Sequence, residues 1–193
     1  MSVRVRSLGI IAFCSVATMA LWVSASAVVP ALRESVGLPP MIASLFTSSV
    51  QAGFVVGTII SALFNLADRF DPRRFFMASA LTAAAANALI LAFEPASFAV
   101  IGLRFATGVC MAGIYPVGLK LAASWARGNM GLMLGGLVGG LTLGSAAPHP
   151  FNALGGIDWE FTIAAASISA VLAAAAILWV EESRTRQSAR LSG

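Results

Sequence analysis

Arg104 is the residue in this chain whose chemistry has the largest physical consequence, because it lies well inside a long apolar segment. An arginine at the centre of a membrane helix costs about 2.5–3.5 kcal/mol and normally faces water or a bound partner. Its guanidinium group can hold a carboxylate or phosphate through two parallel hydrogen bonds. The predicted spans contain no Asp or Glu well inside the membrane. We therefore expect Arg104 to bind an anionic solute or a carboxylate from another subunit; the alternatives are backbone carbonyl partners or extension to the membrane interface.

Polar side chains recur at intervals of three, four and seven residues along four apolar segments, which places them on one helical face. The stripes include Trp22, Gln51, Arg104 with Tyr115, and His149. We interpret these faces as the lining of a polar interior that binds solute or couples transport to an ion. The alternative is that their Ser and Thr residues join neighbouring helices through hydrogen bonds.

His149 is the only histidine and lies between Pro148 and Pro150, which must interrupt a helix. A lone histidine can titrate near neutral pH and couple transport to protons, or it can be a polar residue at a helix end. One histidine and the separated Cys14 and Cys110 cannot form a structural zinc site. We expect no metal and no cofactor.

An enzyme is not expected. Ser145 and His149 fall on one face of one predicted helix. Intramembrane serine proteases of the rhomboid type instead take these two residues from different helices, with a Gly-x-Ser-Gly turn that this sequence lacks. No catalytic residue is therefore assigned.

Six apolar segments must position these residues, and each is long enough to cross a membrane as a helix. About 20 apolar residues span the hydrocarbon core, and a helix satisfies its own backbone polar groups there. The predicted spans are 8–31, 41–66, 74–94, 97–122, 130–153 and 159–180. The third and sixth, almost purely aliphatic apart from Asn87, are predicted to be peripheral. The predicted fold is all-α: one six-helix transmembrane bundle over residues 1–180 and a polar cytoplasmic tail at 181–193.

The composition excludes an ordinary soluble domain, because 59% of the residues are hydrophobic and only 10% are charged. Soluble domains carry about 25% charged residues. The net charge of +4 resides mostly in basic residues at the ends of apolar segments. That placement predicts membrane orientation and no binding of nucleic acid.

Arginine is distributed unequally between the two sets of loops. One side holds Arg4, Arg6, Arg69, Arg73, Arg74, Arg127, Arg184, Arg186 and Arg190, whereas the other holds only Arg33. The positive-inside rule therefore predicts that both termini are cytoplasmic, and we expect a bacterial inner-membrane protein. Lys120 is near the same side and is expected to extend its amine to the interface.

The fifth predicted span is rich in glycine. Gly131, Gly135 and Gly139 follow one another at intervals of four, with Gly140 and Gly144 beside them. Small residues at this spacing let helix backbones approach closely, so we predict a helix-packing face here. A phosphate-binding loop is excluded because no preceding strand and no Lys-Ser/Thr pair accompany the glycines.

The loop after the second span resembles a signature of the major facilitator superfamily of secondary transporters. Residues 66–74 read Leu-Ala-Asp-Arg-Phe-Asp-Pro-Arg-Arg, which is similar to the family's cytoplasmic-loop pattern Gly-x-Leu-Ala-Asp-Arg-x-Gly-Arg-Arg. Phe64 stands at the first glycine of that pattern, and Asp71 with Pro72 stands at the second.

Two further stretches carry the same resemblance in the expected order. Arg104-x-x-x-Gly108, with Tyr115-Pro116 further along, is similar to the family's fourth-helix signature. The glycine-rich fifth span, which ends here in Pro148, is similar to the family's fifth helix. Together with the order of spans and the orientation, the resemblance extends over essentially the whole chain.

The resemblance implies secondary active transport, by symport or antiport, in which two six-helix bundles rock around a central site. It implies that Asp68, Arg69, Arg73 and Arg74 form a cytoplasmic gate against the other bundle. It also implies that Arg104 lines the cavity for solute or proton coupling.

Twelve spans would need about 240 membrane residues, and this chain has 193. We therefore expect a half-transporter whose partners are membrane lipid, a small solute and a second bundle, either a split or truncated partner half or a second copy in a homodimer. The alternative is a non-transporting membrane assembly subunit or an inactive truncated remnant of such a transporter.

Overall fold

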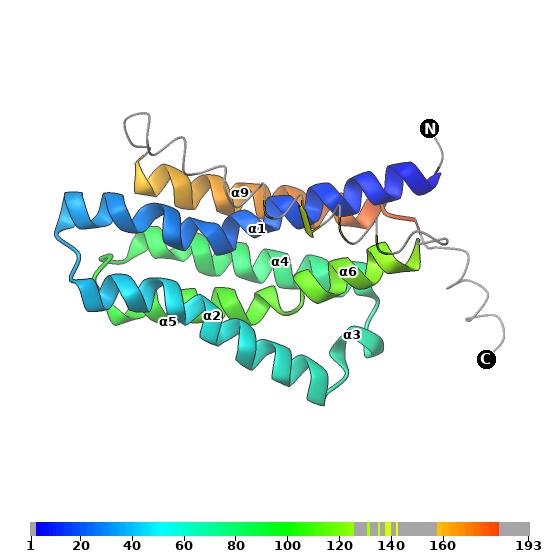
Figure 1. The fold of residues 1–193 in the computed structure, drawn as a ribbon, viewed down its shortest axis with the longest axis horizontal. Coiled ribbons are helices and arrows are strands. Elements are labelled where there is room, and N and C mark those ends of the chain that lie inside the picture. The colour runs from blue at the N-terminus through cyan, green and yellow to red at the C-terminus, as the bar shows by residue number, and fades with distance from the viewer. Residues whose placement is uncertain are drawn as a thin grey trace.

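The computed structural model describes residues 3–125, 131, 135, 138–139, 142 and 158–181, and every regular element in these ranges is a helix. The elements are α1 (Val3–Val36), α2 (Pro40–Leu63), α3 (Leu66–Arg69), α4 (Pro72–Leu89), the 3-10 helix η1 (Ile90–Ala92), α5 (Phe98–Met111), α6 (Tyr115–Ser124), α9 (Trp159–Ala176) and the 3-10 helix η2 (Ile177–Trp179). The long helices lie side by side in an elongated bundle (Figure 1). The all-α prediction is confirmed for the described residues.

Five helical stretches in the described part of the chain are long and apolar enough to cross a membrane. They are Val3–Val36, Pro40–Leu63, Pro72–Ala92, Phe98–Ser124 and Trp159–Trp179. They match five of the six predicted spans. The sixth, predicted at 130–153, lies largely outside the described residues and stays a prediction.

The first helix is longer than the predicted span 8–31, because it continues through basic residues at both ends. It ends before Gly37, whose φ of +63° is the left-handed conformation in which glycine commonly terminates a helix. Pro40 then occupies the first position of α2, where its missing N–H costs nothing. The sharp connection between the first two spans therefore follows from one glycine and one proline in the sequence.

The fourth span is interrupted, whereas the sequence analysis predicted one continuous helix at 97–122. Pro116 cannot donate a hydrogen bond, and its ring clashes with the carbonyl group four residues earlier, at Ala112. The backbone N–H groups of Ala112, Gly113 and Ile114 instead bond to carbonyl groups three residues back, at 3.3, 2.9 and 3.1 Å. Proline thus divides the span into α5 and α6.

Glycines bring α2 and α5 into backbone contact. A Cβ atom added at Gly53 would lie 2.9 Å from the carbonyl carbon of Phe105, and one at Gly108 would lie 2.8 Å from that of Val50. Gly57 is equally close to the backbone of Val109. Because these distances are inside van der Waals contact, only glycine permits this helix separation.

This seam differs from the predicted packing face on the fifth span. No atom lies within 4 Å of a Cβ built at Gly131, Gly135 or Gly139, as far as the described residues show. Gly140 and Gly144 lie outside the described residues. The packing role of these five glycines stays a prediction, and the Gly53–Gly57 pair at the same spacing of four was overlooked.

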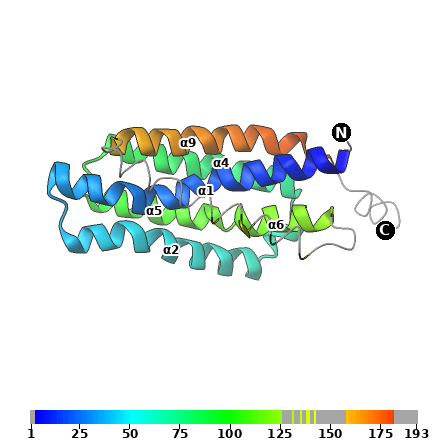
Figure 2. The same ribbon diagram turned by 45° about the horizontal axis from the view of Figure 1, so that its top comes forward.

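The helices form a bundle in which α9 packs against both α1 and α4, and α2 packs against α5 (Figure 2). Small side chains make the α4–α9 contact close, because Ala80 and Ala83 of α4 and Ala170 and Ala173 of α9 are fully buried. Large apolar side chains such as Trp179 are exposed, as expected for helices surrounded by lipid. Membrane insertion thus accounts for a surface that water would not solvate.

Both described chain ends lie at one end of the bundle, together with α3 (Figure 1). Arg6 at the start of α1 forms an ion pair with Glu181 after η2. The end of α6 lies at this same end, whereas α9 begins at the opposite end (Figure 1). Of the arginines predicted to share one side, those in the described residues (Arg4, Arg6, Arg69, Arg73 and Arg74) therefore belong to helix ends at this end of the bundle. Arg33 is in the last turn of α1, at the other end.

Candidate functional site

A cavity of about 250 Å³ lies between α1, α2 and the α5–α6 junction. Its lining residues are Met19, Trp22, Phe54, Met111, Tyr115, Val138 and Thr142. The structure therefore brings together Trp22 and Tyr115, two of the residues that the sequence analysis assigned to solute binding. Phe54 and Met19 were not predicted, since apolar residues in an apolar helix give no distinguishing signal.

Aromatic rings shape this cavity. Trp22 of α1 and Phe54 of α2 meet edge to face, with ring centroids 5.4 Å apart and planes at 83°. That is a favoured arrangement for two aromatic side chains. Tyr115 is the first residue of α6, so the break caused by Pro116 determines where its ring lies.

The described lining residues bring few polar groups to the cavity. The Thr142 hydroxyl donates to the Val138 carbonyl at 2.9 Å. Among the described residues, no hydrogen bond involves the hydroxyl of Tyr115 or the indole N–H of Trp22. Small-molecule sites typically combine an apolar lining with a few such groups.

Gln51 does not join this group. Gln51 is exposed on α2 and is not among the described residues that line the cavity. His149 lies outside the described residues. The binding or coupling roles of both residues stay predictions.

Arg104 is completely buried in the bundle and contacts neutral groups. One terminal nitrogen, Nη1, donates to Asn87 Oδ1 at 2.6 Å and to Ser24 Oγ at 3.2 Å. The other, Nη2, donates to the carbonyl oxygen of Leu21 at 3.3 Å. The ring of Phe46 lies 5.2 Å from the guanidinium carbon, within the range of a cation–π interaction. Arg104 thus has internal partners that the sequence analysis did not identify.

Asn87 extends this network to the last span. Its amide nitrogen donates to the Ile163 carbonyl at 3.1 Å and to the Ser167 hydroxyl at 2.9 Å. The cluster of Arg104, Asn87, Ser24 and Ser167, here called the arginine hub, therefore connects α1, α4, α5 and α9. The sequence contains an indication of this network, because Asn87 is the main polar residue in an otherwise aliphatic segment.

The arginine hub shares no residue with the described lining of the cavity. Arg104 precedes the cavity residue Met111 by seven positions, which is about 10 Å along a helix, and its partner Leu21 directly precedes the lining residue Trp22. Arg104 is not among the described lining residues. Arg104 thus contacts a backbone carbonyl and neutral side chains. These contacts agree with the alternative in which Arg104 holds the helices together. A role in solute binding stays a prediction.

At the end of the bundle that holds the chain ends, Asp68 forms an ion pair with Lys120 of α6. The Lys120 amine also donates to the carbonyl oxygen of Ala67 at 2.8 Å. Lys120 therefore ties the loop before α4 to α6, whereas the sequence analysis expected it to extend to the membrane interface. Arg69 is exposed.

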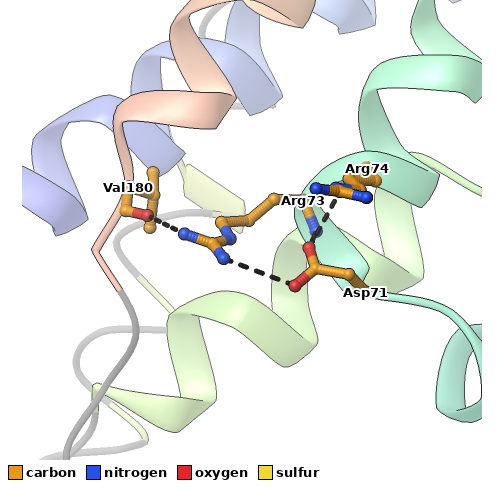
Figure 3. Close-up of polar contacts among 4 residues, drawn as sticks. All are labelled: Asp71, Arg73, Arg74 and Val180. Atoms are coloured by element: carbon orange, nitrogen blue, oxygen red, sulfur yellow. Dashed lines mark hydrogen bonds and ion pairs between the residues drawn. The ribbon is translucent and has the colours of Figure 1, made fainter.

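Asp71 caps the start of α4, and Arg73 connects this helix to Val180 at the end of the last span (Figure 3). One carboxylate oxygen accepts hydrogen bonds from the backbone N–H groups of Arg73 and Arg74 at 2.9 and 3.2 Å. The Arg73 guanidinium reaches the other oxygen at 3.4 Å and the Val180 carbonyl at 3.0 Å. Arg73 is thus engaged within this bundle, and the Arg74 side chain is exposed.

The ionised form of Asp71 is favoured at this position, just outside the span. Burial would raise the pKa of Asp71, but the side-chain hydrogen bond from Arg73, the backbone hydrogen bonds and the Arg73 charge outweigh it. The pKa is therefore lowered from its ordinary value.

Asp71→Ala should lower the stability of the bundle by about 1 kcal/mol, since a lost helix cap costs about 0.5–2 kcal/mol. Because the folded pKa is below the unfolded one, the ionised carboxylate stabilises the protein above about pH 4. This contribution disappears as pH falls through the folded pKa. Thermal unfolding of the detergent-solubilised protein at pH 7 and at lower pH measures it. Asp158→Ala is the matched control, because Asp158 precedes α9 without a side-chain cap hydrogen bond; an equal loss in both variants would contradict the capping role.

Comparison with known proteins adds one finding at the level of the family. The sequence profile described as Major Facilitator Superfamily matches residues 10–193. The match includes the cavity residues, the arginine hub and the loop that carries Asp68. No curated protein and no solved structure matches the chain.

Proposed function

The chain belongs to the Major Facilitator Superfamily and is an integral membrane protein of that transporter family, and we propose that it moves its solute by alternating access around the cavity beside Trp22 and Tyr115. The single observation that carries the transport assignment is the family match over residues 10–193. The cavity supports the location, because it lies between three different helices of the bundle and combines an apolar lining with few polar groups.

A second six-helix bundle completes the transporter in this proposal, supplied either by a partner half or by a second copy of the chain. The family's two halves are related by an axis along the membrane normal, so two copies can have the same orientation. A sixth span at 130–153 is part of the same proposal. The opposite positions of the end of α6 and the start of α9 support it.

The end of the bundle that holds both described chain ends is proposed to face the cytoplasm, in a bacterial inner membrane. The concentration of arginine at this end supports that orientation through the positive-inside rule. Asp68, Arg69, Arg73 and Arg74 form the proposed cytoplasmic gate. Asp68 and Arg73 already have partners in this bundle, so the exposed Arg69 and Arg74 are the residues that reach the second bundle.

The prediction of an anionic solute rests on direct contact between that solute and Arg104. Arg104 is not among the described residues that line the cavity. Arg104 is completely buried, and its terminal nitrogens already donate to Asn87, Ser24 and Leu21. Removing an ion from water costs several kcal/mol in a protein interior. Among the described residues, Arg104 offers an anion in the cavity no direct contact that would offset this cost. Coupling to an ion gradient, as symport or antiport, remains part of the proposal, with His149 as the candidate proton carrier.

Cysteine accessibility tests alternating access without knowledge of the solute. Met19→Cys places a thiol in the cavity after Cys14 and Cys110 are replaced by alanine. A membrane-impermeant maleimide is then added to either side of oriented membrane vesicles. If the cavity opens alternately, the thiol at position 19 should react from both sides.

Thr82→Cys is the control, because Thr82 is exposed on α4 and does not line the cavity. In lipid, its thiol should react from neither side. Reaction at position 19 from one side only, or from neither, would contradict alternating access. That result would favour the non-transporting assembly subunit or the inactive remnant.

A further inference from the structure

Building on the proposed transport function, we infer that the cavity selects an uncharged organic solute with an aromatic or apolar body, and that it discriminates against ions of either sign. The inference concerns the solute class of the cavity beside Trp22 and Tyr115. Three observations carry it: the apolar lining, the neutral hydrogen-bonding groups in that lining and the arrangement of charge around Arg104.

The lining favours an apolar body. Its seven described residues include three aromatic side chains and two methionines, and none of the seven is charged. An aromatic ring can add a further edge-to-face contact to the pair of Trp22 and Phe54. Met19 and Met111 are flexible and polarisable, so they adapt to differently shaped apolar groups.

The polar groups of the described lining indicate which polar groups the solute carries. The cavity has a volume of about 250 Å³ in this bundle, and the proposed second bundle would add its own walls to it. The Tyr115 hydroxyl and the Trp22 indole N–H have no hydrogen-bond partner within the described part of the chain. They match a solute with one or two neutral hydrogen-bonding groups, such as a hydroxyl or a carbonyl.

Charge around the cavity disfavours both kinds of ion. The guanidinium group of Arg104 is surrounded by neutral partners, and none of its described hydrogen-bond partners is a carboxylate. A cation would lose its hydration and would find no acidic partner among the described lining residues. An anion gains little, because the two terminal nitrogens already donate to Ser24, Asn87 and Leu21, and it loses its hydration.

A matched series of three compounds with the same ring tests this inference. The protein is extracted with any co-purifying second bundle and placed in lipid nanodiscs at pH 7. Equilibrium binding is measured for tritiated 2-phenylethanol, phenylacetate and phenethylamine, which are neutral, anionic and cationic. Binding to protein-free nanodiscs is subtracted. We expect 2-phenylethanol to bind at least tenfold more tightly than either ion; equal or tighter binding of an ion, or no binding of 2-phenylethanol, would overturn the inference.

Conservative variants locate the binding. Trp22→Phe and Tyr115→Phe keep a ring and remove one hydrogen-bonding group each, so each should weaken 2-phenylethanol binding by about threefold to tenfold. Trp179→Phe is the matched control, because the Trp179 side chain is 78% exposed at the end of the last span. Equal affinity in the wild type and both cavity variants would place the binding elsewhere and overturn the inference.

The binding and labelling experiments separate the two proposals. Selective binding of 2-phenylethanol with one-sided labelling at position 19 would support the solute class and reject alternating access. Two-sided labelling with tighter binding of phenylacetate would support transport and reject the uncharged class.

Discussion

Gly108→Ala should lower the unfolding temperature of the protein more than any other single methyl group added to α5. The new Cβ would meet the backbone of Val50 inside van der Waals distance, and a backbone carbonyl cannot rotate away as a side chain can. Overpacking of this kind costs about 1–3 kcal/mol. For a chain of this size, a loss of about 3 kcal/mol corresponds to a decrease of roughly 6–12 °C in unfolding temperature.

Gly102→Ala is the matched control for this prediction. Gly102 lies in the same helix, is exposed, and has no atom within 4 Å of an added Cβ. Alanine is favoured over glycine inside a helix by about 1 kcal/mol, so this variant should be as stable as the wild type or more stable. Thermal unfolding followed by size-exclusion chromatography in detergent compares the two. Similar unfolding temperatures for both variants would show that α2 and α5 are not in backbone contact.

Arg104→Gln should destabilise the bundle by about 3 kcal/mol, because the shorter side chain cannot reach the partners of the guanidinium group. Hydrogen bonds to a charged group contribute about 1.5–3 kcal/mol each, and buried acceptors left without a donor carry a further cost. Asn87 Oδ1 and Ser24 Oγ would lose the donor that Arg104 supplies, whereas the Leu21 carbonyl would keep the hydrogen bond from the Ser24 hydroxyl. Arg69→Gln, at an exposed arginine, should change stability by less than about 1 kcal/mol.

A double-mutant cycle with Asn87→Ala tests whether the two residues act as one unit. Contacting residues in one hydrogen-bond network typically show coupling energies of about 0.5–3 kcal/mol. We expect the double variant to lose clearly less stability than the sum of the two single variants. If Arg104 instead serves solute binding, Arg104→Gln would abolish uptake at an unchanged unfolding temperature, and the cycle would show no coupling.

The arginine hub also explains how a bilayer-spanning bundle accommodates a charge without an acidic partner in the described residues. The hydrogen-bond acceptors come from α1 and α4, and Phe46 of α2 adds an aromatic face. Each group is neutral, so no second charge has to be desolvated. Partners from several helices thus offset the cost of burying the Arg104 guanidinium, and the same hydrogen bonds hold these helices together.

The sequence by itself determined which segments become helices and where their ends lie. The thickness of the hydrocarbon core requires about 20 apolar residues in each span, and this requirement can be read directly along the chain. Five described stretches agree with it, with Gly37, Pro40 and Pro72 at the boundaries. The break at Pro116 was also encoded locally, although the sequence analysis predicted a continuous helix there. These features depend on neighbours a few residues apart.

Only the tertiary structure decided which helical faces meet. The period of 3.6 residues places Arg104 and Tyr115 on related faces, but it does not show that one enters a polar hub and the other a cavity. Arg104 meets Leu21, which is 83 positions away in the chain, and Lys120 meets Asp68, 52 positions away. Gly53 of α2 and Gly108 of α5 likewise matter because each lies against the backbone of the other helix. Contacts between distant segments depend on how whole helices pack. That packing is determined by many side chains acting together, so it cannot be read from the spacing of residues along one helix.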